Sequence, residues 1–515
     1  MSRVSSECSG KLCARRNGMP PKTRRFVVST GFGPSHNLGV YNNNVDTVQR
    51  AFVERYFLCK EGDGFRPALP VKASAFNNQR FKDFRHFVVE DMPRLPRLTR
   101  SAVVERYNGP KRKVYEAAHR SLCKNPLVEE DSHLTSFVKF EKQDVHKAPR
   151  VINPRSSRYN LELGRYLKHA EHHYFASINR AFGARTRATV IKGFNADVSA
   201  QILRSKWELF KNPVAIGLDA SKFDMHVSVE ALKYEHSFYM RLFPGSRSLR
   251  KLLSWQLRNR GRAYVSDGSV HFEMKGTRSS GDLNTSLGNC ILMCAMIHAY
   301  AKERGVDIEL CNNGDDCVLI METADQERFL KGLDDWFRTR GFAMVAEDPV
   351  YEFEGIEFCQ THPVQLSSGW RMLRNHSAVL TKDPMCLLPV PNGKVYRKWL
   401  DAVGVCGTIA TAGSPVQHSF YSVMKREGTT AGEGLTREVF RNQSMATRIA
   451  GITGAHHVDA RARVSYYYAF GVLPDVQKQM ELYYDGMSLD DYVVSSPMDR
   501  SDLFLEPGLI VNQSN

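Results

Sequence analysis

The segment Ile308-Glu-Leu-Cys-Asn-Asn-Gly-Asp-Asp-Cys-Val-Leu-Ile-Met321 consists of two apolar runs joined by a polar turn. Asn313-Gly314 supplies residues that tolerate positive φ angles, so the segment predicts a β-hairpin. Asp315 and Asp316 lie at the tip of this hairpin or just beyond it. Adjacent carboxylates repel each other and resist burial, and a divalent cation would offset that cost. A solvated turn explains these residues equally well, so the rest of the chain has to decide.

A second pair of acids follows another apolar run. Val214-Ala-Ile-Gly-Leu-Asp219 predicts a buried strand that delivers a carboxylate at its C-terminal end, and Asp224 comes five residues later. A single aspartate at a strand end is more often a cap. Acids that reach the Asp315 turn from a separate strand would instead suit a pair of metal ions.

Composition limits the class of protein. The chain has 515 residues, 42% of them hydrophobic, which is enough for a large core and several subdomains. Its net charge of +16 predicts an anionic partner, with nucleic acid first and an anionic membrane surface second. The 11 cysteines show no zinc-binding spacing and indicate reduced thiols. No signal peptide is visible, and the longest apolar run, from Leu287 to Tyr300, is too short to span a membrane, so we expect a soluble protein.

The N-terminal region predicts few functional elements. Residues 1–25 are basic and are expected to be mobile. Phe26-Val-Val-Ser-Thr30 is strand-like, and Gly31 to Gly39 superficially resembles a dinucleotide fingerprint. Pro34 and the absence of a following apolar helix favour a loop instead. Residues 46–58 have helical periodicity, with Asp46 as the expected N-cap.

Residues 137–158 predict a basic hairpin. Phe137-Val-Lys-Phe-Glu-Lys142 alternates like a strand, and a polar loop leads to Pro149-Arg-Val-Ile-Asn-Pro-Arg-Ser-Ser-Arg158. Several fixed cations on a strand pair can neutralise a triphosphate and its leaving pyrophosphate. Ordinary surface charge is the alternative. The cations of this hairpin are Lys139, Lys142, Lys147, Arg150, Arg155 and Arg158.

Two further segments are expected to be helical. Residues 161–182 include His169 and His173 at a spacing that could hold a metal, although a structural role is favoured because the zinc-protease pattern is missing. Residues 279–289 form a loop of small side chains that runs into a helix expected to begin at Cys290. Such a loop can approach a sugar and a phosphate, or simply cap the helix.

Three motifs occur in a fixed order. They are Asp219-x-x-x-x-Asp224, Ser280-Gly-x-x-x-Thr285-x-x-x-Asn289 and Gly314-Asp-Asp316. Together they resemble motifs A, B and C of viral RNA-dependent RNA polymerases. Further stretches are similar to the plant-virus family Tombusviridae, namely Phe137 to Lys142 with Pro149 to Ser156, Asp348-Pro-Val-Tyr-Glu352, Glu357-Phe-Cys-Gln360 and Gly31-Phe-Gly-Pro-Ser-His-Asn37.

The resemblance implies an α+β right-hand fold with fingers, a palm of antiparallel sheet flanked by helices, and a mainly helical thumb. Residues 1–25 would be the basic flexible segment, and 26–210 the fingers with motif F and an extension to the thumb. Residues 211–365 would form the palm with motifs A to E and a fingers insertion around 245–280. Residues 366–515 would form the thumb and the C-terminal tail.

The resemblance also implies the chemistry. Asp219 and Asp315 would ligate two Mg²⁺ ions, for which Mn²⁺ could substitute, with Asp316 beside them. The substrate-binding residues implied by similarity are Asp224, Thr285 and Asn289 at the ribose 2′-hydroxyl, Ser280 and Gly281 in a flexible loop near the template, and Lys139, Lys142, Arg150 and Arg155 along the NTP channel, with Arg150 on the triphosphate.

Two regions leave alternatives open. Relatives commonly have a lysine in motif D as proton donor to pyrophosphate, whereas this chain has Val345 there. The alternative donors are Lys331, Arg338, Arg340 and water. In the expected thumb, the aromatic runs Tyr396-Arg-Lys-Trp399 and Tyr466-Tyr-Tyr468 could contact RNA, but aromatic residues at these spacings are more often core. The tail from Ser495 is expected to be loosely held.

The implied function is RNA-dependent RNA synthesis from NTPs, in genome replication and subgenomic RNA synthesis of a positive-strand RNA virus. Implied partners are the RNA template and product duplex, host factors and an auxiliary viral protein that attaches the chain to membranes of the host cytoplasm. A reverse transcriptase would use dNTPs and usually has an aromatic residue where this chain has Asn313-Gly314. A nonenzymatic RNA-binding or capsid protein would explain the charge but not Asp219 and Asp315.

Overall fold

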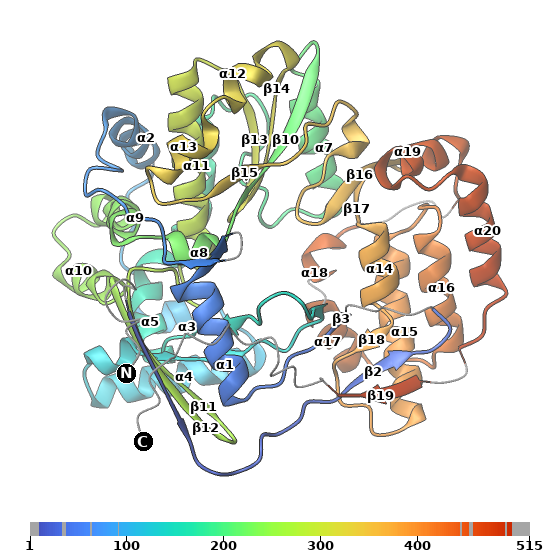
Figure 1. Ribbon diagram of the computed structural model, residues 1–515, viewed down its shortest axis with the longest axis horizontal. Coiled ribbons are helices and arrows are strands. Elements are labelled where there is room, and N and C mark those ends of the chain that lie inside the picture. Colours follow the sequence, from blue (N-terminus) through green and yellow to red (C-terminus); the bar gives the residue numbers. More distant parts are fainter. Residues whose placement is uncertain are drawn as a thin grey trace.

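The predicted hairpin lies in a central four-stranded sheet. The computed structural model describes residues 10–32, 38–61, 64–90, 92–442, 445–452, 457–489 and 492–496. Strands β13 (Glu309–Asn313) and β14 (Asp316–Glu322) pair antiparallel through a turn in which Gly314 has a φ of +76°. Strand β10 (Pro213–Ala220) pairs with β14, and β15 (Met344–Ala346) pairs with β10. Both strand predictions around the acids are therefore confirmed (Figure 1).

Both faces of this sheet are buried against hydrophobic cores. Successive side chains of a strand point to opposite faces, so neighbouring residues belong to different cores. Ile216 and Leu319 face one core, which includes helix α11 (Thr285–Arg304). Ala215 and Ile320 face another core, which includes helix α7 (Ala196–Trp207). The strands are thus held rigidly, and the acids at their ends have little freedom to separate.

A second four-stranded sheet has the order β1-β12-β11-β6. Its strands are β1 (Gly10–Arg16), β12 (Gly268–Lys275), β11 (Arg258–Val265) and β6 (Leu134–Thr135). The expectation of a mobile basic segment is wrong for residues 10–16, because β1 pairs along its whole length with β12. Residues 1–9 lie outside the described residues.

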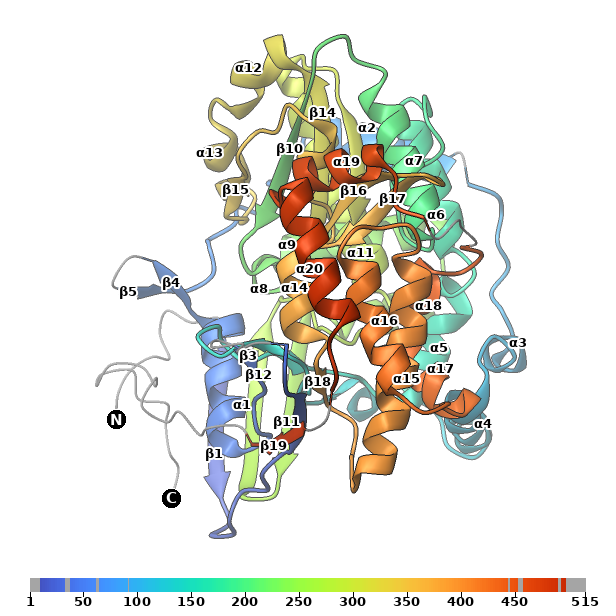
Figure 2. The same ribbon diagram turned by 90° about the vertical axis from the view of Figure 1, so that its right-hand side faces the viewer.

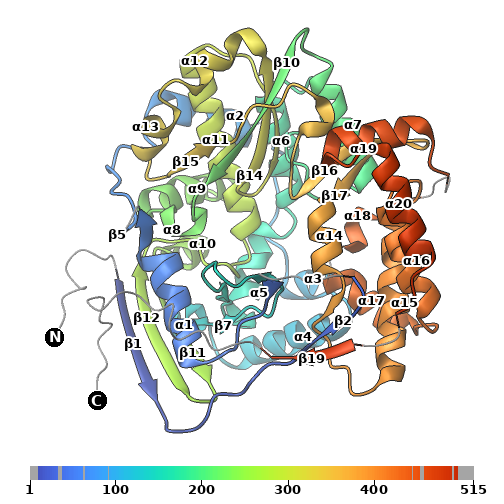
Figure 3. The same ribbon diagram turned by 45° about the vertical axis from the view of Figure 1, so that its right-hand side comes forward.

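Helix α1 (Val45–Phe52) packs against one face of this sheet and continues into a π-helical turn (Val53–Phe57) (Figure 3). The predicted helix is confirmed, but its N-cap is Asn44, whose side chain accepts from the N–H of Thr47. Asp46 lies in the first turn instead, where its charge interacts favourably with the helix dipole.

Most of the remaining helices before the C-terminal region contribute to the core of the central sheet. These remaining helices are α2 (Gln79–Glu90), α3 (Arg100–Val104), α4 (Gly109–Lys124), α5 (Ser157–Leu167), α6 (Glu171–Ala181), α8 (Phe223–His226), α9 (Val229–Leu242), α10 (Arg247–Ser254), α12 (Gln326–Leu330) and α13 (Leu333–Arg338). Of these, α3 and α4 pack with α5 in a separate core. Residues 161–182 are two helices, separated by a turn in which the N–H of Ala170 donates to Leu167 O. His169 is buried at this break.

Short strands join distant parts of the chain. The predicted basic hairpin is confirmed by β7 (Phe137–Val138) paired antiparallel with β9 (Val151–Ile152). The other short strands are β2 (Phe26–Ser29), which confirms the predicted strand, β3 (Leu38–Gly39), β4 (Cys59–Glu61), β5 (Gly64–Arg66), β8 (Gln143–Asp144), β18 (Met385–Cys386) and β19 (Tyr492–Ser495). Strand β2 lies between β18 and β19, so the N-terminal and C-terminal regions share one sheet.

The C-terminal region is mainly helical and has its own core (Figure 2). A hairpin of β16 (Thr361–Leu366) and β17 (Gly369–Arg374) leads into it. Its helices are α14 (His376–Lys382), α15 (Gly393–Ala410), α16 (Gln417–Glu427), α17 (Glu433–Asn442), α18 (Met445–Arg448), α19 (Ala460–Phe470) and α20 (Pro474–Asp485).

Most of the aromatic side chains singled out in this region belong to its core. Tyr396, Trp399 and Tyr466 are buried, whereas Tyr467 and Tyr468 are exposed. The tail prediction falls almost entirely on residues 497–515, which lie outside the described residues. Among the helices of the described ranges, none combines the length and apolar character needed to cross a membrane.

Candidate active site

A cavity of about 1080 Å³ opens where three elements meet: the end of β10, the turn between β13 and β14, and the hairpin of β7 and β9. Its lining is strongly polar and carries both signs of charge. The charged lining residues are Glu141, Asp144, Asp219, Asp224 and Asp315, together with Arg55, Lys139, Lys142, Lys147, Arg150, Lys222 and Lys382. Such a mixture suits a phosphorylated substrate that is held by cations next to reactive carboxylates.

The sheet register brings the acids to one edge. Leu218 of β10 lies opposite Cys317 of β14, so Asp219 and Asp316 follow at the next positions of these neighbouring strands. Asp315 occupies the adjoining turn and lines the cavity with Asp219. All three acids are exposed at this edge, but Asp316 is not among the residues that line the cavity. The structure therefore brings together residues that lie almost one hundred positions apart in the chain.

The carboxylates of this edge disfavour one another's charge. Burial raises the pKa of Asp315 to about 6, and the charge of Asp224 adds to this effect. Burial followed by the charge of Asp219 raises the pKa of Asp316. Glu347, which sequence reasoning did not single out, has its pKa raised by burial and then by the charge of Glu357. The edge is a concentrated negative site that a cation would stabilise.

Asp224 is held by two hydrogen bonds from the predicted motif B. Ser280 Oγ donates to one carboxylate oxygen of Asp224, and Asn289 Nδ2 donates to the other at 3.2 Å. Thr285 does not join them, because its Oγ1 donates to Ser279 O at 2.7 Å. Helix α11 begins at Thr285 and not at Cys290, so Asn289 reaches Asp224 from the second turn of a helix and not from a loop.

Gly281 allows motif B to pack closely against the basic hairpin. It has a φ of +154°, and a Cβ atom at this position would lie 2.8 Å from the carbonyl carbon of Asn153. On the same interface Asn153 Nδ2 donates to Tyr56 Oη at 3.0 Å, and Tyr56 Oη lies 3.2 Å from Ser280 Oγ. The loop next to Asp224 is therefore anchored to the hairpin that carries the cations.

Three of the predicted hairpin cations differ in availability. Arg150 is half exposed in the cavity, where the nearest acid is Glu141 at 3.6 Å, and its charge acts on Asp315. Lys139 pairs with Glu141 at 2.6 Å and remains partly exposed. Lys142 lines the cavity, but its Nζ donates to Lys382 O at 2.6 Å, so it connects the hairpin to the end of α14.

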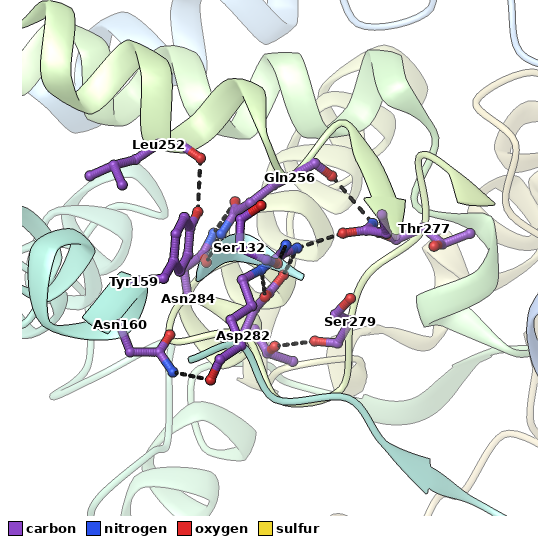
Figure 4. A network of polar contacts seen from close by, with 12 residues as sticks. Ser132, Tyr159, Asn160, Leu252, Gln256, Thr277, Ser279, Asp282 and Asn284 are labelled. Carbon is purple, nitrogen blue, oxygen red and sulfur yellow. Dashed lines mark hydrogen bonds and ion pairs between the residues drawn. The ribbon is translucent and has the colours of Figure 1, made fainter. Parts of the chain in front are cut away.

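The expectation that Arg155 lines the channel is contradicted. Its guanidinium is buried, forms an ion pair with Asp282, and donates to Asn259 Oδ1 and to Ser132 O. Asp282 and Ser132 belong to a polar network that also includes Gln256 and Asn284 (Figure 4). A charge that is fully paired inside the protein stabilises the fold and cannot meet a substrate.

Sequence reasoning missed several residues that line the cavity. Lys222 stands between the two acids of motif A, and this position alone could have indicated it. Arg55 lies on the π-helical turn and donates to Ala148 O and Pro149 O, directly before Arg150. No local pattern signals Arg55, because its partners are more than ninety residues away.

The proposed replacements for a motif D lysine lie outside the cavity. Val345 pairs with Asp219 in the sheet and has an exposed side chain. Arg338 pairs with Asp334, and Arg340 lies 3.6 Å from the centre of the Trp336 ring. Neither arginine nor Lys331 is among the residues that line the cavity.

The acids fit a divalent cation only in part. Within the described ranges, no three Asp, Glu, His or Cys side chains are gathered as a complete metal-binding group. The raised pKa values of Asp315 and Asp316 nevertheless indicate that their surroundings disfavour the charged carboxylates, which a bound cation would stabilise. This suits Mg²⁺, which proteins usually bind through one or two carboxylates together with substrate phosphates and water.

The fold and this cavity suit a protein that holds a phosphorylated substrate between acids and cations. A family model described as viral RNA dependent RNA polymerase matches residues 12–491. The RNA-directed RNA polymerase of Tobacco necrosis virus (strain A) is 40% identical over 505 residues, which are 96% of this chain and 68% of that protein. The chain therefore belongs to the viral RNA-dependent RNA polymerases.

Two further relatives support this assignment to the family. The RNA-directed RNA polymerase of Cymbidium ringspot virus is 41% identical over 487 residues, which are 92% of this chain and 58% of that protein. The corresponding protein of Tomato bushy stunt virus (strain Cherry) is 41% identical over 475 residues, or 90% and 56% of the two chains. The resemblance to the Tombusviridae is confirmed, and the chain spans a little over half of the length of these two relatives.

We expect substitutions of Arg155 and Arg150 to differ sharply in their effect on the free energy of unfolding. Arg155→Ala leaves Asp282 charged, buried and unpaired, so we expect unfolding in urea to be easier by about 3–5 kcal/mol. Arg150→Ala removes an exposed cation and should change the free energy of unfolding by less than about 0.5 kcal/mol. Equal destabilisation by the two substitutions, measured by tryptophan fluorescence, would show that Arg155 is not the buried structural charge.

Asp315→Asn should stabilise the protein at neutral pH. The folded pKa of Asp315, about 6, lies above its value in an unfolded chain, about 3.9, so the charged form is disfavoured by folding. The cost is absent below about pH 4 and complete above about pH 6. We expect the melting temperature to rise by about 1–2 °C at pH 7.5 and to be unchanged at pH 4.

The matched control is Asp485→Asn, at an exposed residue of α20, which should not change the melting temperature at either pH. A lower melting temperature for Asp315→Asn at pH 7.5 would contradict the assignment of Asp315 as a destabilised carboxylate.

Proposed function

We propose that this chain is the catalytic portion of an RNA-dependent RNA polymerase that copies single-stranded viral RNA. The observation that carries the proposal is the single cavity in which Asp219 and Asp315 face Lys139 and Arg150. In the reaction, the 3′-hydroxyl of the growing RNA loses its proton to water, and its oxygen forms a bond to the α-phosphorus of an NTP. The bond between the α-phosphorus and the bridging oxygen breaks, and pyrophosphate leaves with the electron pair.

The right-hand division of the chain is part of this proposal. Residues 211–365 contain the central sheet and correspond to the palm, with β11 and β12 as the fingers insertion. Residues 26–210 correspond to the fingers, and residues 366–515 to the helical thumb and tail. Support for an extension from fingers to thumb comes from β2, which pairs with β18 and β19.

Two Mg²⁺ ions would be held by Asp219 and Asp315, with Asp316 adjacent, and would supply charge neutralisation at the α-phosphate and the leaving pyrophosphate. The chain's own cations have a matching task. Arg150 presents a planar guanidinium that suits phosphate oxygens, and Lys139 and Lys222 add positive charge around it. Arg55 braces the backbone before Arg150 and so orients it.

Selection of the ribose is proposed for Asp224. Both of its carboxylate oxygens are held in place, by Ser280 and by Asn289, and the side chain lines the cavity. Each carboxylate oxygen can accept a second hydrogen bond, so the fixed Asp224 can also accept one from a 2′-hydroxyl, and this bond is lost when that hydroxyl is missing. Thr285 supports this arrangement indirectly, through the loop at Ser279.

The proposal extends to the setting that the family implies. Template, product duplex and NTPs would be the substrates, in genome replication and subgenomic RNA synthesis. An auxiliary viral protein would attach the chain to membranes of the host cytoplasm, together with host factors. Binding of the purified chain to liposomes without any partner would contradict the dependence on such an auxiliary protein.

Labelled NTP incorporation on single-stranded RNA with Mg²⁺ tests the main proposal. We expect template-dependent product from the unaltered chain and a loss of at least about 1000-fold in Asp315→Ala, because the reacting phosphate loses a metal ligand. Arg150→Ala should mainly raise the KM for NTP. Template-dependent product made equally well by Asp315→Ala would show that Asp315 has been misassigned.

Discrimination between ATP and dATP tests the role of Asp224. Asp224→Asn weakens the acceptor and should reduce the ratio of the two kcat/KM values by about tenfold or more. Thr285→Ser keeps the hydroxyl that bonds Ser279 O and should leave the ratio unchanged. An unchanged ratio in Asp224→Asn would show that the ribose is read elsewhere, and preference for dNTPs in the unaltered chain would favour a reverse transcriptase.

A further inference from the structure

One face of the β1-β12-β11-β6 sheet carries exposed side chains that do not line the cavity. Along β11 the side chains alternate, so Asn259 and Ala263 are buried while Arg258, Arg260 and Arg262 are exposed. Tyr264 continues the exposed row and is 62% exposed. Alternate residues of a strand lie roughly 6.8 Å apart, so the three arginines form an evenly spaced line.

The register extends this line across the neighbouring strands. Residues paired across a sheet share a face. Lys11 of β1 and Arg260 of β11 both pair with Glu273 of β12, and Arg15 of β1 and Tyr264 of β11 both pair with Ser269. We call the exposed set the basic sheet face, which consists of Lys11, Arg15, Arg258, Arg260, Arg262 and Tyr264.

The positive charge of the basic sheet face is only partly neutralised. Glu273 pairs with Arg258 and Arg260, and Glu129 lies 3.8 Å from Arg260. Within the part of the chain that the structure describes, Lys11, Arg15 and Arg262 have no ion-pair partner. Arg262 Nη1 instead donates to Tyr264 Oη at 3.2 Å, which places a guanidinium without an ion-pair partner beside an exposed tyrosine.

This face is distinct from the candidate active site. Helix α1 packs against β1 and β12, and Ala14, Val270 and Ala263 contribute to the core between them. The basic side chains stand on the opposite side of the strands, because they alternate with these buried residues. No member of the basic sheet face is among the residues that line the cavity.

We propose that the basic sheet face is a second RNA-binding site, which holds single-stranded RNA against the outer surface of the β1-β12-β11-β6 sheet. Arginines contact phosphates through paired donors, and an exposed tyrosine offers a ring on which any base can stack. Open sheet surfaces that combine aromatic and basic side chains are a recurring way to bind single strands. The site rests on the proposed function only in that its ligand is RNA, since no chemistry of the cavity is involved.

An anionic membrane is the competing ligand for such a surface. Membrane surfaces are bound by basic residues together with apolar side chains that enter the headgroup region. Within the described ranges, the only large hydrophobic side chain exposed on this face is Tyr264, whose hydroxyl accepts from Arg262. The composition of the face therefore favours RNA.

The test measures binding of the full chain to a fluorescently labelled 20-nucleotide single-stranded RNA at several salt concentrations. Arg15→Ala with Arg262→Ala removes two unpaired cations, and Arg328→Ala with Lys478→Ala removes two exposed cations elsewhere as a matched control. We expect the first pair to weaken binding by at least about tenfold and to lower the slope of log affinity against log salt by about 1.4, at about 0.7 per phosphate contact. The control pair should change neither.

Substitutions of Tyr264 distinguish base stacking from electrostatic attraction as a source of RNA affinity. Tyr264→Ala should weaken binding by roughly 5-fold to 150-fold, whereas Tyr264→Phe keeps the ring and should bind nearly as well as the unaltered chain. In addition, RNA that carries a photoreactive uridine should cross-link within residues 258–275, and competition by NTPs should not remove this cross-link. Unchanged affinity in both Arg15→Ala with Arg262→Ala and Tyr264→Ala would overturn the proposal.

Two controls distinguish a failure of the proposed RNA-binding site from a failure of the proposed polymerase function. NTP incorporation at saturating RNA should be unchanged in the variants of the basic sheet face, and Asp315→Ala should lose incorporation but retain the cross-link. Flotation with phosphatidylserine vesicles measures the competing ligand. If the Arg15→Ala with Arg262→Ala pair loses vesicle binding but keeps its affinity for RNA, the face binds membranes and the proposal is wrong.

Discussion

The repulsion between carboxylates at the end of the central sheet is the constraint on which the rest of the site depends. Asp219 comes directly after Leu218, and Asp316 comes directly before Cys317, the residue that pairs with Leu218 on the neighbouring antiparallel strand. Asp315 occupies the adjoining turn. The strands cannot move apart to relieve this repulsion, because both faces of the sheet are buried against helices. Burial, to which this repulsion adds, raises the pKa values of Asp315 and Asp316, so positive charge from a ligand would stabilise their charged forms.

The cations of the cavity are positioned in a different way from its carboxylates. Its cations come from a hairpin with little regular strand, so their positions depend on contacts made by the backbone around them. Arg55 binds the carbonyl groups before Arg150, Lys142 joins the hairpin to α14, and Arg155 anchors its base to Asp282. Arg155 is buried away from the cavity, whereas Arg55 and Lys142 line it and also hold the backbone around it in place.

Because side chains alternate along β11, one face of the strand is buried in a core and the other is exposed and basic. Its buried residues complete a core with α1, whose π-helical extension carries Arg55 and Tyr56 at the cavity. Its exposed residues form the basic sheet face on the other side. Cations of this basic chain thus gather both in a cavity that also carries acids and on an outer sheet surface that carries few acids.

The sequence by itself determined the elements whose causes are local. The Asn313-Gly314 turn, the apolar run before Asp219 and the order of the three motifs were enough to predict the hairpin, the central strand and the family. Only the tertiary structure decided which charges are available, because their partners lie far away in the chain. Arg155 and Asp282 are 127 positions apart, and β1 becomes ordered by pairing with β12, more than 250 residues later. Local patterns reveal where a strand or turn forms, but burial and ion pairing depend on surfaces that meet only after folding.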